Sequence, residues 1–245
     1  MWRFRFMERV KTGIEGLDRI LGGGVPRGSS VLVTGGTGTG KTTVSMQFLM
    51  EGLLNGEGCL LVTCEEEPHR LYMEMKQLGW DFEKFEKEGK LVVIDAASTK
   101  AGMPTTTTYR DFQPKSANID MNLVVLIGRA IREYNVKRVV LDSVPALALR
   151  VGKPEALREL LFRVYSMLER FECTSFVVTE TLEGEGSLSR YGVEEFLSSG
   201  VIKVSLQKEG GKWIRKMQVV KMRGTRHDLN EHVFEITEGG IKLKD

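Results

Sequence analysis

This sequence of 245 residues lacks a large excess of charge of either sign, paired cysteines and long apolar runs. Its 35 basic and 33 acidic side chains leave a net charge of +2, so no overall field draws the chain to nucleic acid or to anionic lipid. A local basic ring would be enough to bind DNA, so nucleic acid is disfavoured as a partner but not excluded. No apolar run approaches the ~18 residues of a membrane-spanning helix, and we expect no membrane partner.

The cysteines are Cys59, Cys64 and Cys173, an odd number without CxxC spacing. All three lie in apolar or strand-like stretches, which indicates buried thiols in a reducing compartment and not disulfides or a metal site. Residues 1–10 contain three arginines, and their aromatic alternation differs from the apolar region of a signal peptide. These features predict a cytoplasmic protein.

Glycine, by contrast, is abundant, and four glycines fall within the first six positions of residues 35–43, GGTGTGKTT. The pattern Gly35-x-x-x-x-Gly40-Lys41-Thr42 is a complete Walker A sequence, preceded by a strand-like run and followed by helical spacing. Glycine permits backbone conformations closed to other residues, so successive N–H groups can point at a polyphosphate in front of the helix N-terminus. This context predicts a site for a nucleoside triphosphate.

Two side chains of this loop have chemistry that a plain glycine-rich turn would not need. Lys41 would reach the β- and γ-phosphates as a mobile positive charge, and the Thr42 hydroxyl would be a ligand of Mg²⁺. We therefore expect ATP or ADP together with Mg²⁺. The other members of the expected phosphate-binding set are Gly36, Thr37, Gly38, Thr39, Gly40 and Thr43.

Acidic residues follow two further strand-like runs. Residues 138–142, RVVLD, have the form of a Walker B strand, in which Asp142 would hold Mg²⁺ through its water shell opposite Thr42. Residues 59–64 read as a strand buried on both faces, and Glu65 follows them directly. At the carboxyl edge of an α/β sheet, Glu65 would face the ligand crevice.

The order of elements predicts the fold class. Strand-like and helical stretches alternate through residue 180, and a hairpin signal at residues 209–212 then separates two runs of strand period. We expect one α/β domain over residues 1–245, a RecA-like P-loop core with a mainly parallel, twisted sheet flanked by helices and a C-terminal antiparallel β-hairpin. An N-terminal arm and loop would occupy residues 1–28, and the core residues 29–245.

Three segments leave more than one interpretation open. Residues 2–6 have strand period with one aromatic face and would cover their own sheet or extend a neighbour's. Residues 96–120, rich in Thr, Ser, Pro and Gly, read as a long loop whose four consecutive threonines are phosphorylation sites or, as we favour, plain solvated loop. Residues 174–180 read as a buried strand that ends in Glu180. Glu180 would sense the γ-phosphate, orient the attacking water or simply mark the end of the strand.

Five blocks of the sequence, in order between residues 11 and 236, together resemble the KaiC-like ATPases of the RecA superfamily. These blocks are TGIEGLDRILGGGVPRGSSVLVTGGTGTGKTTVSMQFL, LLVTCEEEP, RVVLDSVPAL, GVEEFLSSGVI and VVKMRGTRH. The resemblance implies a RecA-type core that assembles with itself into a ring, commonly a homo-hexamer, with ATP held between neighbouring subunits. This chain resembles one such domain, whereas the family's circadian clock protein carries two in tandem.

The resemblance also implies roles for individual residues. Glu65 and Glu66 match the family's catalytic glutamates, with Glu65 as the water-activating base and Glu66 as its partner. Lys221 and Arg223 match the basic residues that reach the γ-phosphate of the adjacent subunit. His227 falls where the family approaches the base or ribose of the nucleotide. The clock protein's phosphorylated serine–threonine pair has no counterpart here, so neither circadian function nor a kinase activity is expected.

Three functions are compatible with these features. The favoured interpretation is a slow ATPase whose ring is a regulatory switch or scaffold for a client protein that the sequence does not name. The first alternative is a DNA-acting recombinase paralogue of the RadB type or a ring helicase, with residues 98–118 and 182–192 lining a channel. The second is a nucleotide sensor that binds ATP and barely cleaves it. The cations available to such a channel are few: Lys100, Arg110, Lys115 and Arg190.

Overall fold

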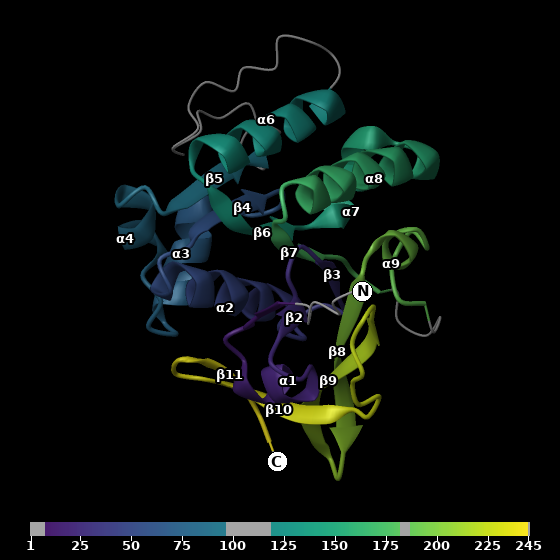
Figure 1. Cartoon of the computed structure of the whole chain (residues 1–245). Helices are drawn as coiled ribbons and strands as arrows, with labels where there is room; N and C mark the ends of the chain where they lie inside the picture. The colour runs from purple at the N-terminus through teal and green to yellow at the C-terminus, as the bar shows by residue number, and fades with distance from the viewer. Residues whose placement is uncertain (1–7, 97–118, 182–186, 245) are drawn as a thin grey trace, which may run out of the picture.

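The computed structural model describes residues 8–96, 119–181 and 187–244 of the chain. In this part, a central sheet of nine strands has the order β11-β10-β9-β8-β3-β7-β6-β4-β5 (Figure 1). Its strands are β3 (Ser30–Thr34), β4 (Gly58–Thr63), β5 (Leu91–Asp95), β6 (Val136–Asp142), β7 (Thr174–Val178), β8 (Gly200–Glu209), β9 (Lys212–Met222), β10 (His232–Thr237) and β11 (Gly240–Leu243). Two short strands, β1 (Arg9–Val10) and β2 (Val25–Pro26), pair antiparallel beside it.

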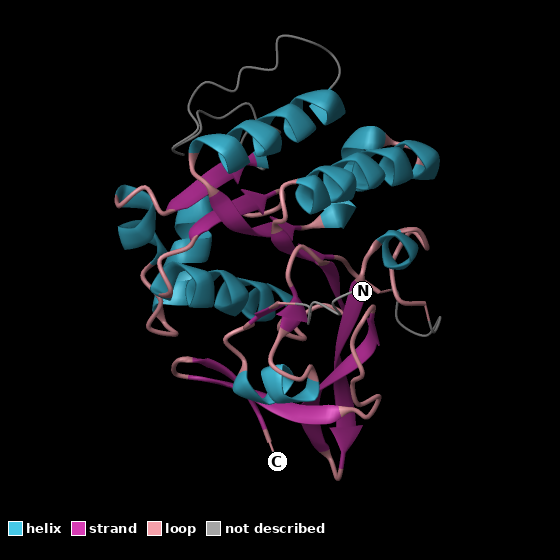
Figure 2. Cartoon of the chain, viewed as in Figure 1, coloured by secondary structure: helices cyan, strands magenta, loops and turns pink. Residues whose placement is uncertain are grey.

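Helices cover both faces of the sheet (Figure 2). The core on one face includes residues of α1, α2, α3 and α4, and the core on the other includes residues of α6, α7 and α8. The bounds are α1 (Glu15–Ile20), α2 (Lys41–Leu54), α3 (Pro68–Lys76), α4 (Phe82–Lys87), α6 (Ile119–Glu133), α7 (Val144–Val151), α8 (Pro154–Arg170) and α9 (Glu194–Leu197). None of the helices in the described ranges has the length and apolarity needed to cross a membrane.

The parallel part of the sheet consists of six strands, β8, β3, β7, β6, β4 and β5. Successive side chains of a strand point to opposite faces, so Val31 and Val33 enter the core beside α2 while Leu32 enters the core beside α8. Both faces are therefore apolar, which explains the continuous apolar runs of these strands in the sequence.

Beyond β8 the sheet becomes antiparallel. β8 and β9 form a long hairpin closed at residues 209–212, and β10 and β11 continue the sheet outward. In β11, the main-chain N–H of Ile241 donates to Gln47 of α2 at 2.7 Å, which ties the end of the chain to the helix after the phosphate-binding loop. The predicted fold class is confirmed, namely a mainly parallel sheet flanked by helices with C-terminal antiparallel strands.

The segment at residues 8–28, expected as an arm and loop, contains regular structure. Its helix α1 buries Leu17 completely, and Ile14 and Leu21 on either side of the helix are also fully buried. Before the helix, the Thr12 hydroxyl and N–H both donate to Asp18 at 2.8 Å. A helix of six residues is too short to show a helical period in the sequence, so the segment reads as a loop there.

Other expectations concern segments that the structure describes in part. The strand expected at residues 2–6 lies outside the described residues, as do residues 97–118 of the predicted long loop. Helix α6 begins at Ile119, slightly earlier than the loop boundary expected at residue 120. The three cysteines are buried and none of them forms a disulfide, as the sequence predicts.

A buried arginine lies near the start of β6, at the amino edge of the sheet. The Arg138 side chain is 2% exposed, and its Nε donates to Glu57 at 2.6 Å. Its Nη1 donates to the main-chain oxygens of Lys11 at 2.7 Å and Phe48 at 3.0 Å, and the guanidinium lies 4.8 Å from the centre of the Phe48 ring. A Cβ at Gly52 would come within 2.5 Å of the Arg138 side chain, so only glycine leaves room for it.

Candidate functional site

The glycine-rich loop connects β3 to α2 at the carboxyl edge of the parallel sheet. Gly40 precedes the helix with a left-handed φ of 103°, and α2 begins at Lys41. Gly35 passes so close to β8 that a Cβ there would lie 2.0 Å from the Val204 carbonyl oxygen. These two positions therefore require glycine for backbone reasons, and the Walker A spacing follows from the path of the loop.

Inside the loop, side chains fold back onto the main chain. Lys41 Nζ donates to the Gly36 carbonyl oxygen at 2.8 Å, and the largely buried Thr39 donates to the same oxygen at 2.8 Å. Burial lowers the pKa of Lys41, while nearby Glu180 and Asp142 act in the opposite direction. An ammonium group held against a glycine-rich loop in this way is suited to donate to phosphate oxygens in place of the carbonyl oxygen.

The expected metal ligands are brought together by α2 and β6. Thr42 Oγ1 donates to Asp142 Oδ2 at 2.8 Å, although the two residues lie about 100 positions apart in the sequence. Burial raises the pKa of Asp142 to about 6, the hydrogen bond from Thr42 opposes this, and the charge of Glu65 adds to it. A bound cation would relieve this cost of ionisation.

The donor set fits Mg²⁺, because a hydroxyl and a carboxylate are hard oxygen ligands within reach of one ion. Magnesium is commonly held by one or two such protein groups together with phosphate oxygens and waters. Thr42 and Asp142 provide the protein groups, and the adjoining Walker A loop provides the place for phosphates.

Glu65 lies at the end of β4, next to Asp142. Ser143 Oγ donates to Glu65 Oε1, so the residue after the Walker B aspartate orients the candidate base. The peptide bond between Asp142 and Ser143 is cis. Glu65 is exposed, and in the described part of the chain no cation forms an ion pair with it. Sequence reasoning assigned no role to Ser143, because a serine after an apolar strand carries no signal of its own.

Glu66 is placed differently from Glu65. Its main-chain oxygen accepts from Thr63 Oγ1 at 2.5 Å, and its exposed side chain lies toward Glu74 and Arg70 of α3. Partial desolvation raises the pKa of Glu66, and the charge of Glu74 adds to this. Glu65 is therefore held by the residue after Asp142, whereas the side chain of Glu66 makes no such contact among the described residues, and we describe Glu66 as lying at the rim of the site.

Two further charged residues lie beside the loop. Glu180, beyond the end of β7, is among the charges that act on Lys41, and it pairs with Arg190 at 3.3 Å. Arg215 of β9 donates to the Gly38 carbonyl oxygen at 3.5 Å, a contact that the sequence did not predict. No local pattern could reveal it, because the register of the β8–β9 hairpin alone carries Arg215 to the phosphate-binding loop.

The cations predicted to act on ATP from the hairpin side lie elsewhere in the chain. Lys221 pairs with Val201 at the start of β8, and β8 runs parallel to β3, whose end leads into the phosphate-binding loop. Lys221 therefore lies at the amino edge of the sheet, and Arg223 and His227 follow it beyond β9. Within one chain the structure brings Lys41, Thr42, Asp142 and Glu65 together. It does not bring Lys221, Arg223 and His227 to that group.

Comparison with known proteins gives consistent matches over nearly the whole chain. A family model described as "ATPase: KaiC" matches residues 10–245. The UPF0273 protein of Methanopyrus kandleri is 38% identical over 237 residues, 97% of this chain and 92% of that protein. The circadian clock oscillator protein KaiC of Synechococcus elongatus is 36% identical over 237 residues, 96% of this chain and 44% of that longer protein.

A solved structure agrees with these sequence matches. The crystal structure of a KaiC-like protein from the archaeon Pyrococcus horikoshii superposes with a TM-score of 0.84 and 39% sequence identity. The match covers 98% of this chain and 100% of the other.

Proposed function

The chain belongs to the KaiC family of ATPases in the RecA superfamily, which confirms the resemblance seen in its sequence, and we propose that it hydrolyses MgATP in sites shared between the subunits of a homo-oligomeric ring. One observation carries this proposal. The pocket residues Lys41, Thr42, Asp142 and Glu65 lie at the carboxyl edge of the sheet, and Lys221 lies at its amino edge. Such a division suits head-to-tail packing, in which each interface joins two different surfaces.

In the proposed reaction, water attacks the γ-phosphate in line with the leaving oxygen. The backbone of residues 36–40 and Lys41 would hold the phosphates, and Thr42 with Asp142 would hold Mg²⁺, whose charge would offset that of the phosphate oxygens. Glu65, oriented by Ser143, positions the water and accepts its proton, since it lies next to the metal-binding carboxylate.

The neighbouring subunit supplies the remaining positive charge. Lys221 and Arg223 of that subunit stabilise the charge that develops on the γ-phosphate, and His227 contacts the base or ribose. Arginine supplied in trans is worth ~10³ to 10⁵ in rate, so isolated subunits are expected to turn over slowly. Because activity then depends on assembly, we propose a switch or scaffold role in which the nucleotide state of the ring is read by a client protein.

A single series of measurements tests this function. Molecular mass is measured with and without MgATP, and ATP turnover is measured on the same sample across protein concentration. The proposal predicts that mass and turnover per subunit rise together, with a hexamer as the expected ring. A monomer that turns over ATP at full rate would contradict the shared site, and a ring that barely cleaves ATP would favour a nucleotide sensor.

Binding to single-stranded DNA separates the switch from a recombinase or helicase. We expect no gel shift at ~150 mM salt, because few cations are available to follow a phosphate backbone. A shift that persists at this salt concentration and disappears in Arg110→Ala would favour the DNA-acting alternative. Arg110 lies outside the described residues, so this test is independent of the geometry above.

A further inference from the structure

Lys221 owes its orientation to an irregularity of β9. Val219 pairs with Ile202 and Lys221 pairs with Val201, so Val220 is an extra residue between the two pairs. Val219 enters the core on the α2 face, whereas Val201 enters the core on the α8 face. In a regular strand, residues two apart share a face, and Lys221 would point with Val219. The bulge turns Lys221 to the opposite face, toward α9.

On that face the ammonium group of Lys221 is held by main-chain oxygens. Nζ donates to the carbonyl oxygens of Glu195 at 2.9 Å and of Ser198 at 2.7 Å. An ammonium group has three N–H donors, and no acceptor for the third is found among the residues that the structure describes. The main chain just beyond β9 is held by the same segment, since the N–H of Arg223 donates to Ser199 O at 2.9 Å. Lys221 is therefore oriented with one donor to spare.

The segment that provides these oxygens, residues 188–199, is anchored by a buried carboxyl group. Glu194 is 0% exposed, and its Oε1 accepts from Thr179 Oγ1 at 3.0 Å. Its Oε2 accepts from the main-chain N–H of Val193 at 3.1 Å. Thr179 directly follows β7, so Glu194 fastens α9 to the sheet.

The same segment spans the sheet from one edge to the other. Thr34, the last residue of β3 before the phosphate-binding loop, donates to Leu188 O at 2.5 Å. At the opposite end, the N–H of Ser199 donates to Ser30 O at 2.8 Å, at the start of the same strand. The oxygens that hold Lys221 therefore belong to a segment whose other end is hydrogen-bonded beside the chain's own phosphate-binding loop.

We propose that Glu194 is a positioning residue that, through the segment 188–199, holds Lys221 where its free N–H meets the γ-phosphate bound by the neighbouring subunit. This inference rests on the proposed shared site. Glu194 itself touches no substrate. Its carboxyl group fixes the carbonyl oxygens of Glu195 and Ser198, and these aim the ammonium.

A double-mutant cycle in the assembled protein tests the proposal. Turnover is measured for wild type, Glu194→Met, Lys221→Met and the double variant, with ring mass as a check. Methionine is close to Glu194 in length but has no carboxyl oxygen, so the acceptors for both the Thr179 hydroxyl and the Val193 N–H are lost. We expect kcat to fall by ~10- to 10²-fold, the range for a misplaced catalytic group, with little change in the KM for ATP. The double variant should be no slower than Lys221→Met.

Additive losses in the cycle, or wild-type turnover in Glu194→Met, would overturn the positioning role. If Glu194→Met does not fold, the same cycle with Thr179→Val decides the question, because that change removes the partner hydroxyl and keeps the carboxyl group. Glu159→Gln, on the exposed face of α8, is the matched control and should match wild type. Wild-type turnover in Lys221→Met would instead contradict the shared site, and the positioning role with it.

Discussion

The two ends of β6 each carry a charged side chain, and the two side chains differ in how many partners they have within the chain. At the amino edge, Arg138 is buried and makes four hydrogen bonds, two to Glu57 and two to main-chain oxygens. At the carboxyl edge, Asp142 accepts one hydrogen bond from Thr42 and lies beside Glu65, and its pKa is raised to about 6. A buried charge with all its partners within the chain supports the fold, whereas crowded carboxylates short of partners are suited to a ligand.

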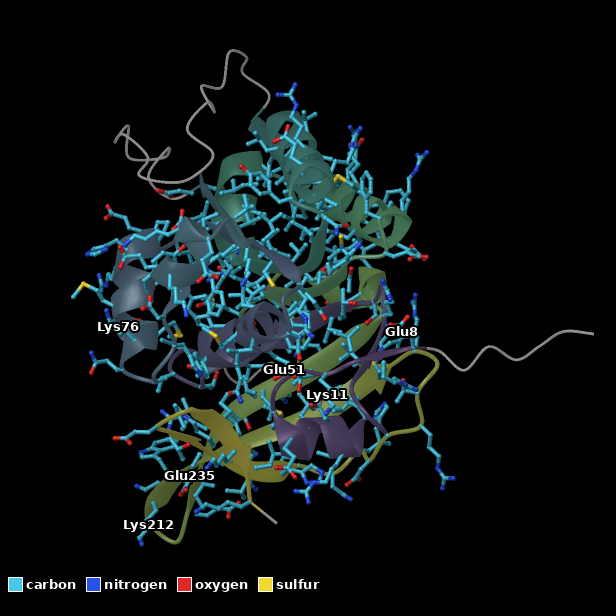
Figure 3. The ribbon with its side chains drawn as sticks, turned by 60° about the vertical axis from the view of Figure 1, so that its left-hand side comes forward. Glu8, Lys11, Glu51, Lys76, Lys212 and Glu235 are labelled. Carbon is cyan, nitrogen blue, oxygen red and sulfur yellow. The ribbon has the colours of Figure 1, made fainter. Side chains whose placement is uncertain are left out.

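The position of a cavity also distinguishes the two edges of the sheet. This cavity, of about 420 Å³, lies at the amino edge, and its lining includes Glu8, Lys11, Glu51 and Arg138. Figure 3 shows Glu8, Lys11 and Glu51 on this side of the molecule. Glu8 pairs with Arg27 at 2.7 Å and Glu57 pairs with Arg138, so charges of both signs are already matched there. The hollow alone is therefore a poorer guide to the site than the unbalanced charge at the other edge.

The largest expected effect on ATP turnover comes from Arg223, which the proposed site receives from the neighbouring subunit. Arg223→Ala should reduce turnover per subunit by ~10³- to 10⁵-fold, the range for an arginine supplied in trans. The ring should remain intact by mass, because Arg223 is exposed in the chain and only its main chain is held within it. Unchanged turnover in a confirmed ring would remove the proposed role of Arg223.

The next largest effect tests the central carboxylate. Glu65→Gln keeps the shape of the side chain and removes its ability to take a proton, so kcat should fall by ~10²- to 10⁴-fold while ATP still binds. Glu66→Gln provides a matched comparison, and its loss should be smaller because Glu66 lies at the rim. Single-turnover hydrolysis and nucleotide binding measure the two quantities separately, and equal losses would contradict the assignment of Glu65 as the base.

Removing the buried charge at the amino edge should lower the free energy of unfolding and leave ATP turnover unchanged. Arg138→Met removes the donors for Glu57 and for two carbonyl oxygens, and we expect a loss of ~3 kcal/mol in the free energy of unfolding. Turnover at temperatures well below unfolding should stay near wild type. Arg27→Met, in an exposed ion pair, is the control and should cost less than ~1 kcal/mol in urea unfolding.

The smallest expected effect is a gain in the free energy of unfolding, and it comes from Asp142 at the carboxyl edge. The pKa of Asp142 is higher in the folded protein, about 6, than the ordinary 3.8, so the folded state holds the proton longer and loses stability as pH rises from ~4 to ~6. Asp142→Asn removes this loss, and the nucleotide-free variant should be more stable by ~2 to 3 kcal/mol above pH ~6. Urea unfolding at pH 4 and pH 7 measures it; equal differences at both values would contradict the shifted pKa.

The sequence predicted the carboxyl edge better than the amino edge, for physical reasons. Phosphate binding requires glycines and a lysine at fixed local spacing, so the loop at residues 35–43 could be identified without a structure. Arg138 lies within the stretch RVVLD, which reads as an apolar strand ending in an acid. Its partners Glu57, Lys11 and Phe48 come from distant segments, and no local pattern records such contacts.

The parts of the site that the sequence missed depend on register and packing. The bulge at Val220 turns Lys221 toward α9, and the hairpin register brings Arg215 to Gly38, yet β9 reads as an ordinary strand. Helix α9 spans four residues, too few to show a period. The family resemblance supplied roles for Lys221 and Arg223, and the fold shows why one chain cannot gather them at its own phosphate-binding loop.

The most direct test of a shared site is complementation between two inactive variants. Glu65→Gln subunits keep Arg223, and Arg223→Ala subunits keep Glu65, so mixed rings contain interfaces in which both groups are intact. After equal amounts are mixed and reassembled, about a quarter of the interfaces are complete, since each half is intact in one subunit of two. We predict that turnover rises to about a quarter of the wild-type value. Turnover that stays at the sum of the two variants, in rings shown by mass to be mixed, would contradict the account.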